Sequence, residues 1–361
     1  MAEPTVASSP GPSQPPSPAR LACFGLGALA VLAFLYGGFW LAMVSQMRDG
    51  FQAWIDARRA EGYTLRVGTF DIGGFPFFIR ATLSEPAIKT PPGLRNWAWQ
   101  GPPLILEARP WAPRRVTAHA PGSHRLVMGG RAGEASFAAQ AAVLDIDLDF
   151  SPGRAAGGYL HVERFAFGGE GAATALRLQK ADGEVRLRGL SDATHTTPTV
   201  EISLGASAID LPGAAGLPFG TAIEQIAFEA ALMGKLPPAA SEAESLVLWR
   251  DDGGTVELRR LDLAYGPLGI HGNGTVALDG ALQPVGAFTA RLQGFFEAVD
   301  ALRARGLIRD RDAITARIVL GALAKRPTAD GPPTLSVPVT IQNRQLYVGP
   351  VALLPMPEVR W

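Results

Sequence analysis

Two hydrophobic patterns divide the chain. Residues Leu21 to Val44 form an apolar run without a single charged side chain. At about 1.5 Å of rise per residue this run makes a helix of roughly 36 Å, longer than a bilayer hydrocarbon core of about 30 Å. Beyond it, apolar and polar residues alternate with a period of two, which is typical of strands. We therefore expect one transmembrane helix followed by a β-rich domain.

The alternation is clearest in Ala142 to Phe150, where aliphatic residues alternate with Asp145, Asp147 and Asp149. Similar segments begin at Val200, Ile226, Leu268 and Phe288. Turn-forming clusters of Gly, Asp and Asn separate them, and such strands are typical of antiparallel sheets with one covered side. The predicted fold is mainly β (α+β), with a large, curved antiparallel sheet. An open groove, a closed barrel and two packed layers all remain compatible with the pattern.

Two segments have helical periodicity instead. Ser45 to Ala60 places Phe51, Trp54 and Ile55 on one face and predicts a helix that continues the apolar run. Gly294 to Arg326 predicts a helical hairpin that lies on the sheet or plugs one end of it.

The predicted organisation follows from these patterns. It comprises a disordered cytoplasmic tail (residues 1–20), a transmembrane helix (21–44), a juxtamembrane helix (45–62) and a periplasmic β-rich domain (63–361).

The apolar run is too long for a cleaved signal peptide and lacks a small-x-small cleavage site. Cys23 lies at its start rather than after it, which argues against a lipoprotein signal. The arginines that follow the run favour an internal domain, but large domains are translocated regardless of such charges. A short tail rich in Pro and Ser favours a cytoplasmic N-terminus and an exported domain. The abundance of Arg, Ala, Gly and Pro is typical of a bacterial protein, so we expect an inner-membrane protein with a periplasmic domain.

Composition excludes several functions. Lys and Arg total 33 and Asp and Glu total 33, without a basic tract, so no nucleic-acid partner is expected. The only cysteine lies in the apolar run, so the predicted domain has no disulfide. Neither His-Glu-x-x-His nor Gly-x-Ser-x-Gly occurs, and the five histidines lack metal-site spacing. We expect no cofactor, no metal, no catalytic residue and no enzymatic activity. A hydrolase would require distant carboxylates, such as Asp71 and Glu107, to face each other across a cleft.

Asp145, Asp147 and Asp149 could in principle hold a hard cation, because one strand face brings them about 6.6 Å apart. Calcium ligands usually come from a turning loop, however, and a solvated strand face is the preferred interpretation.

The segment Gly74-Phe75-Pro76-Phe77 has two interpretations. Phe75 and Phe77 could pack inward at a structural corner. Alternatively, Phe75, Pro76 and Phe77 could form an aromatic lip at the entrance of an apolar groove, and we take them as the candidate site.

The same segment begins a set of motifs rich in Gly, Pro and aromatic residues. The others are Trp97-Ala98-Trp99, Leu104 to Trp111, Leu261 to Ile270, Gly286 to Gly294 and Val348 to Val351. As a set they resemble the bacterial family called domain of unknown function 2125, over about residues 25 to 355. Tyr265 stands where that family usually has Trp before Gly-Pro.

That family is similar to AsmA-like envelope proteins, some of which are linked to phospholipid movement between membranes. The resemblance implies an inner-membrane anchor, a β-rich periplasmic domain and, loosely, lipid handling. It implies no catalytic residue.

The leading hypothesis is an anchored, non-enzymatic protein that binds lipid, such as a phospholipid, or another apolar envelope component on a sheet face. The alternative is a non-catalytic scaffold or assembly factor with an envelope protein as its partner. The ligand, the partner and the oligomeric state are left open.

Overall fold

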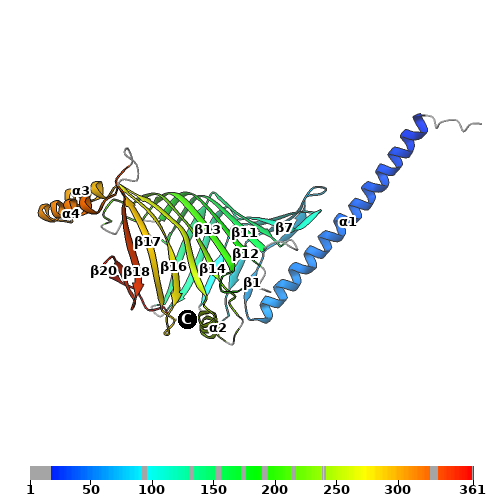
Figure 1. Cartoon of the computed structure of the whole chain (residues 1–361). Helices are drawn as coiled ribbons and strands as arrows, with labels where there is room; N and C mark the ends of the chain where they lie inside the picture. The colour runs from blue at the N-terminus through cyan, green and yellow to red at the C-terminus, as the bar shows by residue number, and fades with distance from the viewer. Residues whose placement is uncertain are drawn as a thin grey trace, which may run out of the picture.

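A computed structural model describes residues 18–91, 96–130, 133–150, 156–171, 176–188, 194–213, 217–237, 239, 241–325, 332–359 and 361. Figure 1 shows a long helix at one end, a broad curled sheet in the middle and two short helices at the other end. The helices are α1 (Pro18–Ala60), α2 (Glu242–Asp251), α3 (Phe295–Ala304) and α4 (Asp310–Leu323). The predicted mainly β fold is confirmed.

Twenty strands belong to one antiparallel sheet. They are β1 (Thr64–Arg66), β2 (Phe70–Gly73), β3 (Ile79–Leu83), β4 (Ala87–Lys89), β5 (Trp97–Gln100), β6 (Leu104–Arg109), β7 (Ala112–His119), β8 (Gly122–Gly130), β9 (Gly133–Ala141), β10 (Val143–Asp149), β11 (Ala156–Gly169), β12 (Leu176–Leu187), β13 (Pro198–Asp210), β14 (Ala222–Met233), β15 (Thr255–Tyr265), β16 (Leu268–Leu278), β17 (Pro284–Gln293), β18 (Leu335–Gln342), β19 (Gln345–Val348) and β20 (Val351–Pro355). From β11 to β20 each strand pairs with the next in the chain. The sheet is open, with β1 and β2 at one edge and β20 at the other.

The first ten strands are halves of five longer strands. β9 and β10, for example, lie end to end along β11, since Gln140 pairs with Ala166 and Val143 pairs with Glu163. In the same way β7 continues into β8, β5 into β6, β3 into β4 and β1 into β2. The breaks line up across neighbouring strands and form a crease through the sheet.

Proline and left-handed residues mark this crease. Pro86, Pro102 and Pro121 lie in three of the breaks, where a missing N–H interrupts a ladder of hydrogen bonds. On β11 and β13 the crease passes through Arg164 and Ala208, which have φ values of 45° and 50°. Both residues face the same position of β12, because the residue pairs on either side of each of them involve the same two residues of that strand. The crease therefore crosses β11 and β13 at the same level.

Apolar side chains from both sides of the crease pack together. Ala141, Val162 and Ala181 are buried there. Around them pack the partly buried side chains of Leu144, Leu160, Phe165, Leu178 and Ala206. Because these residues come from strand segments on both sides of the breaks, the sheet is bent at the crease toward its apolar face.

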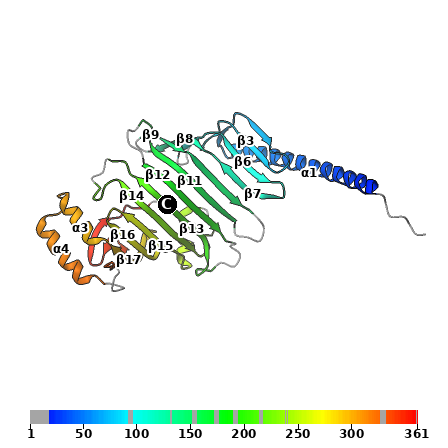
Figure 2. The same cartoon turned by 90° about the horizontal axis from the view of Figure 1, so that it is seen from above.

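The predicted helical hairpin is present as α3 and α4, inserted between β17 and β18. It starts at Gly294, whose φ is 70° and where a Cβ would lie 1.7 Å from the Pro267 carbonyl oxygen, so only glycine fits. The hairpin extends from the end of the sheet beyond β16 and β17 (Figures 1 and 2). Helix α2 follows β14, and its buried Trp249 donates from Nε1 to the Met233 carbonyl oxygen at 2.8 Å.

The crease packing generates a stability prediction. Ala141 is 1% exposed, so Ala141→Leu places a larger side chain among packed neighbours and should lower the free energy of unfolding by about 1–3 kcal/mol. Urea unfolding of the detergent-solubilised protein, followed by tryptophan fluorescence, measures this change. Ala138→Leu, at an exposed position on the opposite face of the same strand, is the matched control and should change stability by less than about 0.5 kcal/mol. Equal effects of the two variants would contradict the crease packing.

Candidate functional site: the apolar face of the sheet and its junction with α1

One face of the sheet is apolar across almost its whole width. Residues directly opposite each other in neighbouring strands lie on the same face, so the register defines rows that cross the sheet. One row runs through Ile72, Ala81, Leu106, Ala118, Ile146, Leu160, Gly183, Leu204, Phe228, Leu261, Gly272, Ala290 and Val337. Every member is apolar or glycine, over thirteen strands from β2 to β18.

A second row on this face has the same character. It runs through Ile79, Ala108, Val116, Leu148, Gly158, Val185, Ile202, Ala230, Leu258, Gly274, Phe288 and Val339. A row next to the first one, on the opposite face, runs through His119, Asp145, His161, Asp182, Gly205, Ala227, Asp262, His271, Arg291 and Ser336. The sheet therefore has one apolar face and one mainly polar face.

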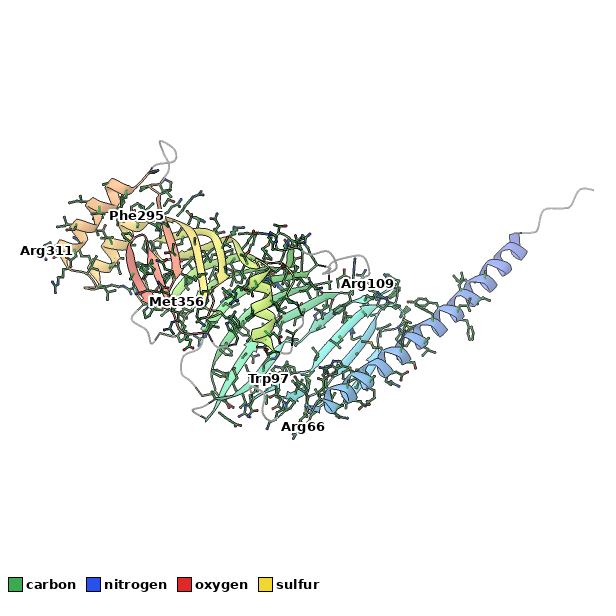
Figure 3. All side chains as sticks on the ribbon, turned by 60° about the horizontal axis from the view of Figure 1, so that its bottom comes forward. Arg66, Trp97, Arg109, Phe295, Arg311 and Met356 are labelled. Atoms are coloured by element: carbon green, nitrogen blue, oxygen red, sulfur yellow. The ribbon has the colours of Figure 1, made fainter. Side chains whose placement is uncertain are left out.

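Most of the apolar face is only half-buried. Val185 is 38% exposed, Ile202 40% and Leu187 49%, although all three belong to strands inside the sheet. Among the described residues no large aliphatic or aromatic side chain is less than 2% exposed; Thr199 and Pro110 are the largest side chains that reach that level. A second layer would bury these rows, as in a sandwich, so the apolar face lacks such a layer over most of its width. Figure 3 shows the side chains on the open sheet.

Helix α1 covers the first part of this face. Beneath it Ile79, Ala81 and Leu83 of β3 are buried, at 3%, 0% and 4% exposure. On the helix, Trp40 and Ile55 are buried in turn, and Phe51 stacks on Phe70 with ring centroids 4.3 Å apart.

Beside this contact lies an apolar cavity of about 290 Å³. Its walls come from α1, from both sides of the crease and from the first strands, and include Phe51, Trp54, Leu65, Leu83, Trp99 and Leu106. Leu106 belongs to the first apolar row described above, so the cavity is continuous with the apolar face.

The predicted site residues Phe75, Pro76 and Phe77 lie in the turn between β2 and β3, against the apolar run of α1. Tyr36 donates from its hydroxyl to the Pro76 carbonyl oxygen, and Trp40 donates from Nε1 to the Phe78 carbonyl oxygen at 3.0 Å. The Phe75 ring contacts Trp40 edge-on, with centroids 5.4 Å apart.

Neither phenylalanine packs into a domain core. Phe75 is 57% exposed, and the element that its ring contacts is α1. Phe77 is 63% exposed and therefore does not pack inward. The Phe75–Pro76 peptide bond is cis. Sequence reasoning missed the contact with α1, because nothing in the spacing of Tyr36 and Trp40 indicates a partner far along the chain.

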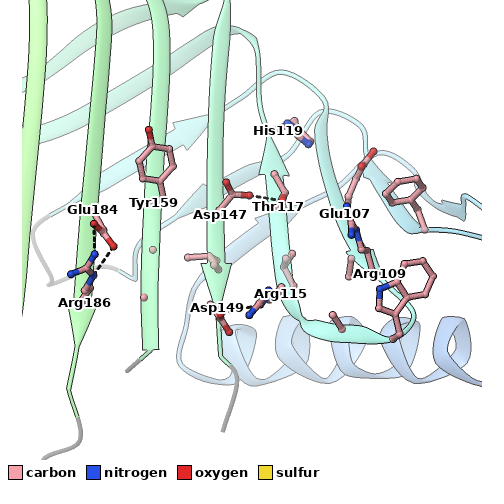
Figure 4. A pocket seen from close by; sticks show the side chains of 18 residues that line it. Glu107, Arg109, Arg115, Thr117, His119, Asp147, Asp149, Tyr159, Glu184 and Arg186 are labelled. Carbon is pink, nitrogen blue, oxygen red and sulfur yellow. Dashed lines mark hydrogen bonds and ion pairs between the residues drawn. The ribbon is translucent and has the colours of Figure 1, made fainter. Parts of the chain in front are cut away.

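The polar face has a hollow of about 1050 Å³ over β6, β7 and β10 to β12 (Figure 4). Its charged side chains are largely paired with each other. Each aspartate of β10 contacts its cross-strand neighbour on β7: Asp145 with His119 at 2.6 Å, Asp147 with Thr117 at 2.5 Å and Asp149 with Arg115 at 3.1 Å. Glu184 pairs with Arg186 at 2.6 Å.

These pairs are relevant to the cation site and to the hydrolase that the sequence analysis considered. The described residues contain no group of three or more His, Cys, Asp or Glu side chains arranged to hold a metal ion. Glu107 is paired with Arg80 at 2.5 Å on β3, the strand that lies between Glu107 and Asp71. The hollow is therefore best described as a network of cross-strand ion pairs on a hydrated face.

Within the polar row, His161 and Asp182 form a closely spaced pair. His161 Nδ1 lies 2.6 Å from Asp182 Oδ1, and the Tyr159 hydroxyl donates to the same oxygen at 2.7 Å. The hydrogen bond to Asp182 raises the pKa of His161 above its ordinary value of 6.5. Hydrogen bonds from Tyr159, His161 and Lys180 lower the pKa of Asp182 to about 2. Sequence spacing did not reveal this pair, since its members come from different strands.

The His161–Asp182 pair predicts a pH-dependent stability. The raised pKa of His161 means that its contribution is complete below pH 6.5 and is lost as the pH rises through the folded-state pKa. The lowered pKa of Asp182 means that its contribution is present above pH 3.8 and is lost as the pH falls toward 2. His161→Gln should therefore lower the urea midpoint more at pH 5 than at pH 8. In an Asp182→Asn background the difference between the two pH values should be smaller, because only Glu163, 3.3 Å from Nε2, then favours the charged imidazole. A pH-independent effect of the single variant would contradict the pairing.

Comparison with known proteins gives one result for this chain. A family model matches residues 40–357, which include the end of the apolar run, the Phe75–Phe77 turn and the whole described sheet. No curated protein and no solved structure matches the chain, so the likeness to AsmA-like proteins stays an expectation. Because the match covers most of the chain, the protein belongs to the family described as "Uncharacterized protein conserved in bacteria (DUF2125)".

Proposed function

We propose that this protein is a non-enzymatic, membrane-anchored protein of the bacterial inner membrane that binds lipid acyl chains on the apolar face of its periplasmic sheet. The observation that carries the proposal is the thirteen-strand apolar row with no second layer over most of it. Exposed apolar surface is unfavourable in water by about 25 cal/mol per Å², so such a face favours an apolar ligand.

The position of α1 supports a membrane source for that ligand. Within the described residues α1 is the one helix long and apolar enough to cross a membrane, and Leu26, Leu29 and Phe34 on it are more than 60% exposed. In a bilayer these side chains would contact lipid, whereas Tyr36 and Trp40 would lie in the interfacial region that such aromatics favour. The Phe75–Pro76–Phe77 turn, packed on both, would then lie at the membrane surface.

Beyond this turn α1 buries Ala81 and Leu83 of β3, so a route for lipid passes beside this contact. The α1-lined cavity lies there, with Leu83 and Leu106 in its wall, and it is continuous with the apolar face. In this proposal an acyl chain leaves the bilayer beside α1, passes through that cavity and lies across the apolar rows. Phe75, Pro76 and Phe77 form the lip of that route, and no side chain has a catalytic role.

The alternative is a scaffold that holds an envelope protein. A scaffold needs no lipid-sized apolar surface, and a filled domain core would have favoured it. The half-buried apolar face favours the lipid-binding proposal instead. A protein that supplied its own apolar layer could still cover the face, and the experiment below separates the two.

The test uses two variants on adjacent positions of β13. Ile202→Glu places a charge on the apolar face, at a side chain that is 40% exposed, while Ser203→Glu places the same charge on the polar face. The full-length protein is purified in mild detergent, and lipids that co-purify are measured by mass spectrometry. We expect lipid to co-purify with the wild type and with Ser203→Glu, and several-fold less lipid with Ile202→Glu, because a buried unpaired charge opposes acyl binding.

A photo-crosslinking amino acid at the same two positions gives the complementary readout. Position 202 should crosslink to lipid in membranes and position 203 should not. Lipid recovery no higher than that of an unrelated anchored protein would contradict the proposal. Crosslinks from position 202 to one defined protein, without lipid, would establish the scaffold.

A further inference from the structure

The α3–α4 hairpin is held together on one side and open on the other. Arg317 of α4 pairs with Asp300 of α3 at 2.5 Å and lies over the Phe296 ring at 5.2 Å from its centroid. Ala313 is the one buried residue of α4. The side of α4 that faces α3 therefore provides the packing, and the rest of the helix has no partner among the described residues.

The unpartnered side of α4 is aliphatic. Ile314 is 58% exposed and Ile318, one turn later, 68% exposed. Leu323 at the end of the helix is 59% exposed, and Leu307 in the connection from α3 is 53% exposed. On a helix at the surface of a soluble domain these positions are normally polar, so this face requires an apolar environment.

Cations lie close to this face in the sequence, and one of them, Arg305, donates to the Leu217 carbonyl oxygen at 3.0 Å. From residue 303 to residue 312 there are four arginines (Arg303, Arg305, Arg309 and Arg311) and two aspartates, a local net charge of +2 in a chain whose 33 basic and 33 acidic residues cancel. In the described part of the chain none of these four arginines takes part in an ion pair. Lys325 follows the last turn of α4.

Aliphatic side chains flanked by arginine are the pattern of a helix that lies in a lipid–water interface. The aliphatic side chains enter the acyl region, while the arginines extend to anionic headgroups. A protein partner with an acidic rim would also complement the charge. Such a partner does not explain why Leu307, Ile314 and Ile318 are all exposed, on a surface that starts in the connection between α3 and α4 and continues along α4.

We propose that the α3–α4 hairpin binds the surface of an anionic lipid bilayer through Leu307, Ile314 and Ile318 and the neighbouring arginines. The hairpin lies at the opposite end of the sheet from α1 (Figures 1 and 2). Twelve strand spacings separate β2 from β18, about 58 Å along the sheet at about 4.8 Å per spacing. This length follows a curled sheet, and in the proposal the hairpin binds a second bilayer, distinct from the bilayer that holds α1.

The test is a tethering experiment with the full-length chain. The protein is inserted through α1 into nanodiscs of phosphatidylcholine, and flotation measures capture of the nanodiscs by vesicles of phosphatidylcholine with or without phosphatidylglycerol. We expect capture by the anionic vesicles, weakened by salt. The double variants Ile314→Glu/Ile318→Glu and Arg309→Glu/Arg311→Glu should each reduce capture by at least about tenfold. The first places charges where aliphatic side chains enter the acyl region. The second removes basic residues that each contribute about fivefold near an anionic surface.

Leu248→Glu, at an exposed position of α2 (47% exposed), is the control for a lost aliphatic side chain, and Arg177→Glu is the control for reversed charge. Both should tether like the wild type. Tethering that is equal for neutral and anionic vesicles, or that survives both α4 variants, would overturn the proposal. So would a wild-type oligomer in detergent that Ile314→Glu/Ile318→Glu converts to a monomer, because the face would then be a protein interface. Lipid content at the apolar sheet face is a separate measurement, so failure here leaves the proposed function standing.

Discussion

The structure depends on one constraint: a sheet with an apolar face has to cover that face, and this chain covers only the first part of it. Helix α1 buries Ile79, Ala81 and Leu83 of β3, and the crease buries Ala141, Val162 and Ala181. Elsewhere the apolar rows continue without a packed layer, and side chains such as Ile202 stay partly exposed. A domain of this size can bury a large core, but here the apolar residues are spread along a surface. The stability of the sheet therefore comes largely from its hydrogen-bonded ladders and from contacts between neighbouring side chains.

This arrangement gives the apolar run of α1 two roles. The run is long enough to anchor the chain, and its last turns are also part of the domain, through the contacts of Trp40 and Tyr36 with the Phe75–Phe78 turn. The apolar run is therefore both a membrane anchor and a part of the folded domain. The helix fixes the first strands relative to its own axis and forms one wall of the cavity beside Phe51 and Trp54. Its position determines which end of the sheet meets the membrane in the proposed function.

The sequence was sufficient for the elements whose signal is local. Alternation in Ala142 to Phe150 predicted β10, and the helical periodicity after Gly294 predicted α3 and α4. The crease was harder to predict, although Pro86, Pro102 and Pro121 carry its signal, because only the pairing register shows that the interruptions align. The His161–Asp182 pair and the contact between Trp40 and Phe75 could not be predicted, since their members lie 21 and 35 positions apart and meet only through the register and the packing of α1. Whether the sheet closes was likewise undetermined, because an alternating strand reads the same in a barrel, a sandwich or an open sheet.

The two faces of the sheet also separate its ionisable side chains from its aliphatic ones. Catalytic groups need a water-poor pocket in which their pKa values are adjusted to the reaction. Here the ionisable side chains lie on the polar face, where Asp145, Asp149 and Glu184 are matched with cross-strand or neighbouring partners. Partly exposed aliphatic side chains occupy the other side of the same strands. Because the pleat separates the two sets of residues by one position along every strand, the acids and bases of these rows lie on the face opposite the aliphatic side chains, and in the proposed function the lipid meets the aliphatic face alone.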